Sequence, residues 1–323
     1  MDKTLYSVVI PCYNEEEVLP ETHRRLTQVM STMDGSYELV YVNDGSRDNT
    51  AAILNSLAEA DPHVRVVHFA RNGGHQVAVS AGLDYASGDA IVIIDADLQD
   101  PPEIIPQMAE KWRGGAQVVY GKRRSRAGES AFKKLTAKYY YKLMRSLAGD
   151  AFPEDTGDFR LVDKQVADVI RAMPEHNRYL RGMFAWAGFR QEPVLFDRDK
   201  RFAGQTEYTL KRMLRLAADG VIGFSNKPLT FILWTGLFWL AAGLGLGLLL
   251  AVLALFGICD GLWWLAALLC VLTGSTGLSL GILGSYVARI YDEAKGRPLY
   301  VVAATRGFGK EKTPPLHSSA KAL

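Results

Sequence analysis

The stretch AIVIIDADLQDPP, Ala90–Pro102, passes abruptly from an apolar run into a cluster of carboxylates. The β-branched run predicts a fully buried strand of a parallel sheet. Asp95 and Asp97 follow at its end, where two carboxylates are costly to bury without a partner. Together with Gln99 they offer the hard oxygen ligands that suit Mg²⁺ or Mn²⁺. An acidic turn is the simpler alternative, but the two prolines that follow predict a helix start with Asp100 as N-cap, and the combination favours a metal site.

The rest of the amino-terminal half alternates short apolar strands with helical patterns. The other expected strands are Tyr6–Pro11, Glu38–Val42, Val64–Phe69 and Gln117–Gly121. This alternation predicts a doubly wound parallel α/β sheet with right-handed crossovers. Ligands of such sheets bind beyond the carboxyl ends of the strands. Polar residues stand at these ends: Tyr13-Asn14-Glu15, Asn43-Asp44, Arg71-Asn72 and Asp95-Ala96-Asp97.

Two common phosphate-binding motifs are missing from the chain. It has no G-x-G-x-x-G after the first strand and no G-x-x-x-x-G-K-[ST]. The usual dinucleotide and P-loop interpretations therefore lose their main support. A metal held by carboxylates is expected to supply much of the phosphate recognition. Asp44 is placed to accept a hydrogen bond from a ribose hydroxyl or a base N–H.

Composition bounds the class of protein. The 323 residues suffice for one large domain and an appendage, and the net charge of +2 gives no indication of a nucleic-acid partner. The three cysteines are consistent with packing thiols in a reducing compartment. Basic residues, Lys133 and Lys134 among them, recur between apolar ones over residues 121–145. This pattern predicts an amphipathic helix suited to an anionic membrane surface or a phosphate-bearing lipid, or else a solvated surface helix.

The late part of the chain predicts a membrane anchor. Residues 228–287 carry a single charge, Asp260. The apolar stretches on either side of it, Phe231–Ile258 and Leu262–Val287, each exceed the roughly 20 residues that span a bilayer. A hairpin of two transmembrane helices is expected rather than a buried soluble hairpin. Positive residues flank its open ends, which places both termini in the cytoplasm and Asp260 outside.

Four regions follow from these patterns. They are a cytoplasmic catalytic domain over residues 1–196, an amphipathic juxtamembrane connector over 197–227, two transmembrane helices over 228–288 and a basic cytoplasmic tail over 289–323. Asp158 lies beside a glycine where an apolar strand begins, which makes it a candidate active-site carboxylate.

Four motifs together resemble a known family. They are Val8–Glu16, Asn43–Ser46, Asp95–Pro102 and Gly157–Leu161. They are similar to those of the inverting GT-A glycosyltransferases of family 2, and above all to the polyprenyl-phosphate type: the bactoprenol glucosyltransferases and the related dolichol-phosphate mannose synthases. The resemblance covers nearly the whole chain and implies a GT-A domain followed by the two-helix transmembrane hairpin.

The resemblance implies site residues by position. The nucleotide-sugar contacts would be Pro11, Tyr13, Asn14, Glu15, Asp44, Asp95, Ala96, Asp97, Arg123 and Arg201. The metal ligands, for Mg²⁺ or Mn²⁺, would be Asp95, Asp97 and Gln99. The contacts to the acceptor phosphate and lipid would be Arg123, Arg124, Lys133, Lys134 and Arg201. Asp158 would be the catalytic residue near the acceptor, acting either as general base or by orienting the acceptor or a sugar hydroxyl.

One motif departs from the family pattern. Glu207 stands where the R-x-x-G-x-[ST]-K loop that begins at Arg201 usually has a lysine. An acid cannot replace a cation that binds phosphate, so Lys200 or Lys211 is the substitute we expect. The Q-x-x-R-W motif of processive polysaccharide synthases is absent from the sequence, which favours transfer of a single sugar.

The resemblance therefore implies an enzyme of the inner membrane that moves a hexose, most simply glucose from UDP-glucose, to undecaprenyl phosphate. GDP-mannose or a modified UDP-sugar is the alternative donor. A function of another class is a nucleotide-sensing membrane oligomer, which the lack of an ionisable residue within the spans disfavours. The glycine-rich helix faces and the family also imply a homo-oligomer, such as a tetramer.

Overall fold

A mixed eight-stranded sheet forms the centre of the part of the chain that the structure describes. The structure is a computed structural model, and it describes residues 3–124, 156–197, 227–256 and 262–309. The strand order is β7-β5-β6-β4-β1-β2-β3-β8. The strands are β1 (Leu5–Cys12), β2 (Ser36–Asn43), β3 (Val64–Phe69), β4 (Ala90–Ile93), β5 (Val118–Arg123), β6 (Thr156–Asp163), β7 (Gln191–Phe196) and β8 (Val302–Arg306).

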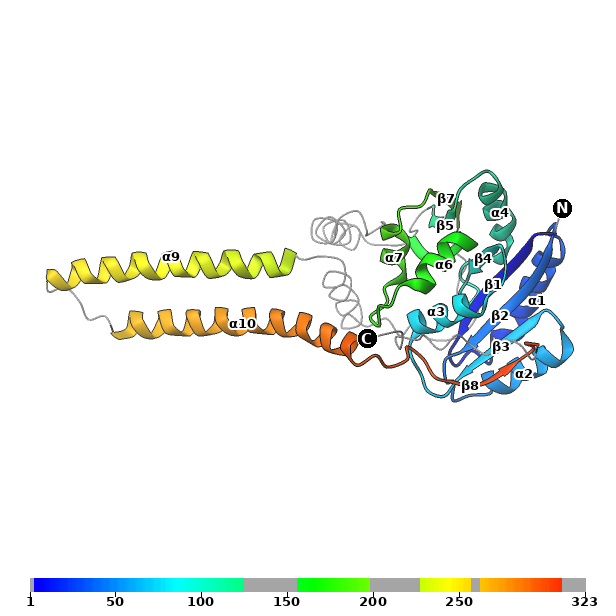
Figure 1. The fold of residues 1–323 in the computed structure, drawn as a ribbon, viewed down its shortest axis with the longest axis horizontal. Helices are drawn as coiled ribbons and strands as arrows, with labels where there is room; N and C mark the ends of the chain where they lie inside the picture. Colours follow the sequence, from blue (N-terminus) through cyan, green and yellow to red (C-terminus); the bar gives the residue numbers. More distant parts are fainter. Residues whose placement is uncertain (1–2, 125–155, 198–226, 257–261, 310–323) are drawn as a thin grey trace, which may run out of the picture.

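Helices cover both faces of this sheet (Figure 1). One face carries α1 (Leu19–Ser31), α2 (Thr50–Ala60) and α4 (Ile105–Arg113), and the other carries α3 (His75–Tyr85), α6 (Lys164–Ala172) and α7 (Leu180–Trp186). Alternate residues of β1 serve the two cores, because successive side chains of a strand point to opposite faces. Val8 and Ile10 pack with the first set of helices and Val9 with the second.

Strand direction departs from the all-parallel expectation. The run β4-β1-β2-β3 is parallel, as predicted. β6, however, lies antiparallel between β4 and β5, with Ile93 opposite Arg160, and β8 is antiparallel to β3. The expectation failed because the apolar pattern of a buried strand reads the same in both directions. The fold is accordingly an α/β fold built on a mixed sheet.

The helix after the carboxylate cluster begins differently from the prediction. A short 3₁₀ turn, η1 (Pro102–Ile104), precedes α4, and Pro101 rather than Asp100 is its N-cap. A proline fits the first turn of a helix because its missing N–H would have no partner there. Asp100 is instead buried, with 3% of its surface exposed. The prediction of Asp100 as the cap was therefore wrong.

Two long helices, α9 (Lys227–Leu255) and α10 (Leu262–Ala294), occupy the apolar stretches of the late chain. They lie side by side and extend away from the α/β domain (Figure 1). Within the described residues, one stretch, Val271–Ala294 of α10, has the length and composition to cross a membrane. The predicted turn at Asp260 lies outside the described residues, as does nearly all of the predicted connector.

The chain after α10 returns to the α/β domain. Ahead of β8, Tyr300 packs its ring on Phe69, with centroids 5.1 Å apart, and donates a 2.8 Å hydrogen bond to Asp84. His176 hydrogen-bonds the Glu293 carboxylate at 2.8 Å and also contacts the Arg297 carbonyl. Residues 302–306 of the predicted tail thus belong to the sheet, and residues 289–294 continue α10.

This attachment should weaken as pH rises. The Arg297 carbonyl and the Glu293 carboxylate raise the pKa of His176 above its usual value. The stability that this histidine contributes is therefore complete below about pH 6.5 and is lost as pH rises through the raised pKa. Hydrogen exchange of residues 297–306, corrected for the intrinsic rate, should speed up over that interval. A His176→Gln variant should lack this dependence, and equal pH profiles for the two proteins would contradict the assignment.

Candidate active site

The carboxyl ends of the parallel strands define the site. The chain runs from β1 through β2 to β3 on one side of β1 and then crosses to β4 on the other side. The strand order therefore reverses beside β1, and this switch point is where open α/β sheets bind ligands. Tyr13, Asp44 and Asp95 follow β1, β2 and β4 and so lie at this edge.

The loop after β1 is tied to the loop after β2. The Asn14 N–H donates to Ser46 Oγ at 3.0 Å, and Asn14 Oδ1 accepts from the Arg47 N–H at 2.9 Å. Asn14 holds a left-handed conformation, with φ of 56°, which a residue adopts only where its surroundings stabilise it. The loop lines a cavity of about 420 Å³ together with Glu15 and Arg47. Tyr13 is 40% exposed at the same edge, while Pro11 pairs within the sheet.

Asp44 organises the loop that precedes α3. Its buried carboxylate accepts the N–H groups of Gly73 at 2.6 Å and Gly74 at 2.9 Å. Burial raises the pKa of Asp44, and the two N–H groups partly offset that rise. Gly74 has φ of 93°, a conformation that glycine adopts without strain, and α3 starts at the next residue. Asp44 thus fixes where α3 begins.

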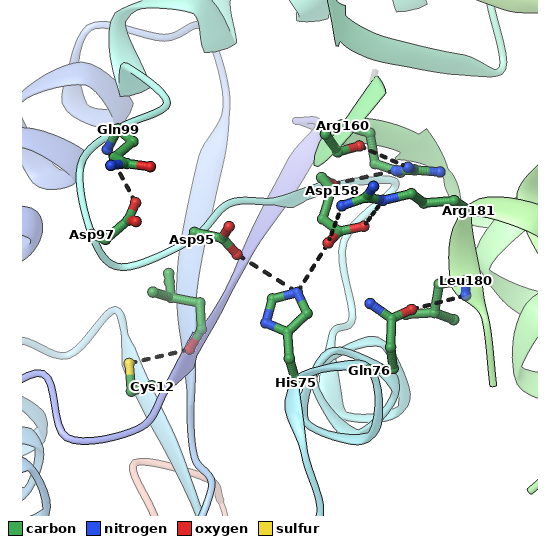
Figure 2. Close-up of polar contacts among 12 residues, drawn as sticks. Cys12, His75, Gln76, Asp95, Asp97, Gln99, Asp158, Arg160, Leu180 and Arg181 are labelled. Atoms are coloured by element: carbon green, nitrogen blue, oxygen red, sulfur yellow. Dashed lines mark hydrogen bonds and ion pairs between the residues drawn. The ribbon is translucent and has the colours of Figure 1, made fainter. Parts of the chain in front are cut away.

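The predicted metal ligands lie on one loop but face different partners (Figure 2). Asp97 Oδ1 accepts from the Gln99 backbone N–H at 3.1 Å across Leu98, whose φ is 57°. Burial raises the pKa of Asp95; His75 opposes the rise, and the Asp158 and Asp97 carboxylates add to it. Asp95 Oδ1 is buried without a hydrogen-bond partner among the described residues. Such an orphaned carboxylate oxygen fits a cation ligand.

No group of three or more His, Cys, Asp or Glu side chains in the described part of the chain is arranged to hold a metal by itself. A site built on Asp95, Asp97 and Gln99 therefore needs further oxygen ligands. Mg²⁺ usually takes such ligands from water and from the phosphates of a substrate.

Asp158 reaches the same edge because β6 runs antiparallel to β4. Its carboxylate accepts hydrogen bonds from Arg181 Nε at 2.7 Å and Nη2 at 2.9 Å, and its Oδ2 lies 3.2 Å from His75 Nε2 (Figure 2). Burial alone would raise the pKa of Asp158, but Arg181 and His75 outweigh it and hold the pKa well below its usual value. Asp158 is consequently an ionised carboxylate and a weak base in this arrangement.

His75 stands between the two halves of the site. Its Nε2 is 3.2 Å from Asp158 and 3.7 Å from Asp95. Burial would lower the pKa of His75, but the two carboxylates outweigh it and raise the pKa to about 9. His75 is therefore cationic at neutral pH and compensates the charge that the carboxylates accumulate.

Sequence reasoning missed three cations of this site. His75 directly follows the polar run Arg71–Gly74 at a strand end, so extending that run by one residue would have found it. Arg181, in α7, and Arg160, in β6, carry no comparable signal. Arg160 is buried with its guanidinium 4.6 Å from the Phe184 ring, and it donates to the backbone carbonyls of Gly157 and Asp158 at the start of β6.

The remaining predicted residues are placed as follows. Ala96 is buried, and its carbonyl accepts from Thr22 Oγ1 at 2.7 Å. Arg123 ends β5, and Arg124 is exposed with its Nη1 3.7 Å from Asp197. Outside the described residues lie Lys133, Lys134, Lys200, Arg201, Glu207 and Lys211.

Comparison with known proteins shows the family to which this chain belongs. Residues 7–171 match Glycosyl transferase family 2. The chain is 45% identical over 95% of its length to the uncharacterized glycosyltransferase YkcC of Bacillus subtilis, of which it covers 96%. It is 37% identical over 92% of its length to the SfII prophage-derived bactoprenol glucosyl transferase of Shigella flexneri, of which it covers 96%.

Among solved structures, the chain is similar to glucosyl-3-phosphoglycerate synthase from Mycobacterium tuberculosis at 20% identity and a TM-score of 0.49, over 68% of this chain and 76% of that one. By the family match and the identity to its relatives, the protein belongs to glycosyltransferase family 2 and is an enzyme that transfers a sugar.

Proposed function

We propose that this glycosyltransferase moves a single hexose, glucose from UDP-glucose, to undecaprenyl phosphate at the cytoplasmic face of the membrane, with inversion at the anomeric carbon. One arrangement carries the proposal: the Asp95 carboxylate, whose Oδ1 makes no hydrogen bond within the described residues, and the ion-paired Asp158 carboxylate lie on either side of His75 at the switch point of the sheet. The similarity to a bactoprenol glucosyl transferase over 92% of the chain supports the choice of sugar and acceptor.

The residues after β4 fit a divalent cation. Asp95, Asp97 and Gln99 would hold Mg²⁺ or Mn²⁺ and leave positions for water and the donor diphosphate. Such a cation neutralises the charge that develops on the diphosphate when the anomeric bond breaks.

Residues at the neighbouring strand ends suit the nucleoside. Each carboxylate oxygen has two lone-pair directions, so Asp44 can accept a ribose hydroxyl or a base N–H while it holds Gly73 and Gly74. The exposed ring of Tyr13 stands at the same edge and offers a face on which a base can stack.

The acceptor needs little help to ionise. A phosphate monoester has a second pKa of about 6, so it is largely dianionic near neutral pH. Asp158, with a depressed pKa, then serves to orient the acceptor or a sugar hydroxyl rather than to remove a proton. This assignment chooses between the two roles that the sequence left open.

The long apolar tail of a polyprenyl phosphate must stay in the membrane. As a two-helix hairpin, α9 and α10 would hold the enzyme at that membrane. Residues 271–294 of α10 support one span. Gly243 and Gly277 face open space. Among the described residues outside each glycine's own helix, no atom lies within 4 Å of the position that a Cβ would occupy. These open positions are consistent with helix contacts in a homo-oligomer.

The proposed topology places the turn between the two helices outside the cell membrane and both termini inside. A Gly261→Cys variant, on a background without the three native cysteines, should react with a membrane-impermeant thiol reagent on intact cells. A cysteine placed at exposed Lys122 in the catalytic domain should react only after lysis. The reverse pattern would overturn the topology.

A donor panel tests the function. Membranes that contain the protein and undecaprenyl phosphate are supplied in turn with UDP-glucose, GDP-mannose and a modified UDP-pentose, and the lipid product is identified by mass spectrometry. The proposal expects a mass increase of one hexose with UDP-glucose. A product formed with another donor would replace the proposed sugar, and the absence of product with every donor would favour the nucleotide sensor.

A further inference from the structure

The first two residues of α3 contact two different elements of the site, β6 and α7 (Figure 2). His75 Nε2 lies 3.2 Å from the Asp158 carboxylate. Its neighbour Gln76 accepts, through Oε1, a 2.9 Å hydrogen bond from the Leu180 backbone N–H. Leu180 and Arg181 are in turn the first two residues of α7, and Arg181 binds Asp158. The contacts form a closed ring through α3, β6 and α7.

Gln76 takes over the capping of α7. The first N–H groups of a helix have no partner within the helix. The N-cap of α7, Tyr179, makes no side-chain cap bond, and the helix is only seven residues long. The bond from Gln76 therefore fixes the position at which α7 starts, and the next residue, Arg181, begins its side chain from that position.

The residues that precede α3 are also held in place. Asp44 holds the N–H groups of Gly73 and Gly74, the two residues immediately before His75. The start of α3 is thus anchored beside the proposed nucleoside contact, and Gln76 extends that anchor to α7. Gln76 reaches neither Asp158 nor Asp95 in the contacts of Figure 2. Its side-chain hydrogen bond leads to Asp158 through Leu180 and Arg181, a path distinct from the direct contact of its neighbour His75.

We propose that Gln76 is a positioning residue for sugar transfer, which aligns Asp158 by fixing Leu180 and hence Arg181. The inference rests on the proposed function for its kinetic consequence. A bidentate ion pair demands exact alignment of both groups, and a displacement of about 1 Å at a reacting centre costs up to about 10²-fold in rate. Loss of the bond should therefore lower kcat, whereas the KM for the nucleotide sugar should hardly change.

Paired variants of Gln76 isolate the bond. Gln76→Met keeps the length of the side chain but removes the acceptor, and Gln76→Glu keeps an acceptor oxygen. We expect Gln76→Met to lower kcat about tenfold with the donor KM within about twofold, and Gln76→Glu to restore most of the rate. In an Arg181→Lys background, Gln76→Met should add less than about a twofold further loss, because both changes act on the same ion pair.

Gln191 supplies the matched control. It donates a 3.0 Å hydrogen bond to the Phe184 carbonyl, so it binds the same short helix at the other end. Gln191→Met should leave kcat within about twofold of the wild type. Equal losses of kcat in Gln76→Met and Gln191→Met, or losses for Gln76→Met and Arg181→Lys that add fully, would overturn the proposal.

A second readout needs no sugar transfer. In the full-length protein labelled with ¹⁵N-arginine in nanodiscs, the Arg181 Nε–H resonance is assigned by its disappearance in Arg181→Lys. Gln76→Met should shift or broaden that resonance, and Gln191→Met should not. An unchanged resonance in Gln76→Met would refute the positioning role. The absence of transfer by the wild-type protein would instead refute the proposed function.

Discussion

Asp95→Asn is expected to lower turnover by about 10³-fold or more, because several kcal/mol of charge stabilisation depend on the cation that this carboxylate would hold. The fold should persist. Asn has nearly the same shape, and its neutral amide avoids the cost of burying the Asp95 charge, which outweighs the attraction of His75 and is increased by the Asp158 and Asp97 carboxylates. Thermal stability should therefore stay the same or rise while activity disappears.

Turnover and thermal unfolding, measured on the same preparations, test whether activity is lost without a loss of stability. Chelation of the wild-type enzyme should reproduce the defect, and added Mg²⁺ or Mn²⁺ should reverse it. Asp168→Asn is the matched control, since that carboxylate is half-exposed on α6 and pairs with Arg171. An Asp95→Asn enzyme with near wild-type turnover, or a wild-type enzyme that tolerates EDTA, would rule out the metal site.

Asp158→Asn should lower turnover by about 10²-fold, and the defect should keep the same size from about pH 6 to about pH 8. Arg181 and His75 keep the pKa of Asp158 far below this interval, so its charge does not change within it. The amide cannot accept both Arg181 bonds in the same way, and the orienting group is lost. The KM for the nucleotide sugar should change little, because Asp44 and Tyr13 lie elsewhere on the edge.

The pH profile separates positioning from base catalysis. A general base is needed mainly while the acceptor is still protonated, below its second pKa of about 6. A defect that shrinks as pH rises would therefore restore the general-base role to Asp158. Wild-type turnover by Asp158→Asn across the range would remove the residue from the mechanism.

The central part of the fold followed from the sequence because buried strands and amphipathic helices have different periods. Val64–Phe69 was predicted with the bounds that the structure shows, and β1, β2 and β4 were predicted to within a few residues. The direction of β6 could not be predicted, although it decides at which edge of the sheet Asp158 lies. In an all-parallel sheet the start of β6, and with it Asp158, would lie at the opposite edge from Asp95.

The site was predictable where it depends on strand ends. Asp44, Asp95 and Asp97 gather at one edge because parallel strands end there. Arg181 was not predictable, because it reaches Asp158 from a short helix that the sequence does not connect to β6. The ionisation of Asp158 could not be predicted for the same reason. The sequence left a general-base role open, and the structure disfavours it because His75 and Arg181 both contact that carboxylate.

Transfer of labelled glucose to lipid tests the central claim most directly. Full-length protein in vesicles with undecaprenyl phosphate receives radiolabelled UDP-glucose, with divalent cation or with EDTA, and the organic phase is counted and its glycosidic linkage determined. The account predicts label in the lipid only with the cation, as one glucose per lipid in the inverted, β configuration. Label that enters the lipid in EDTA, an α linkage, or no label with the cation present would contradict it.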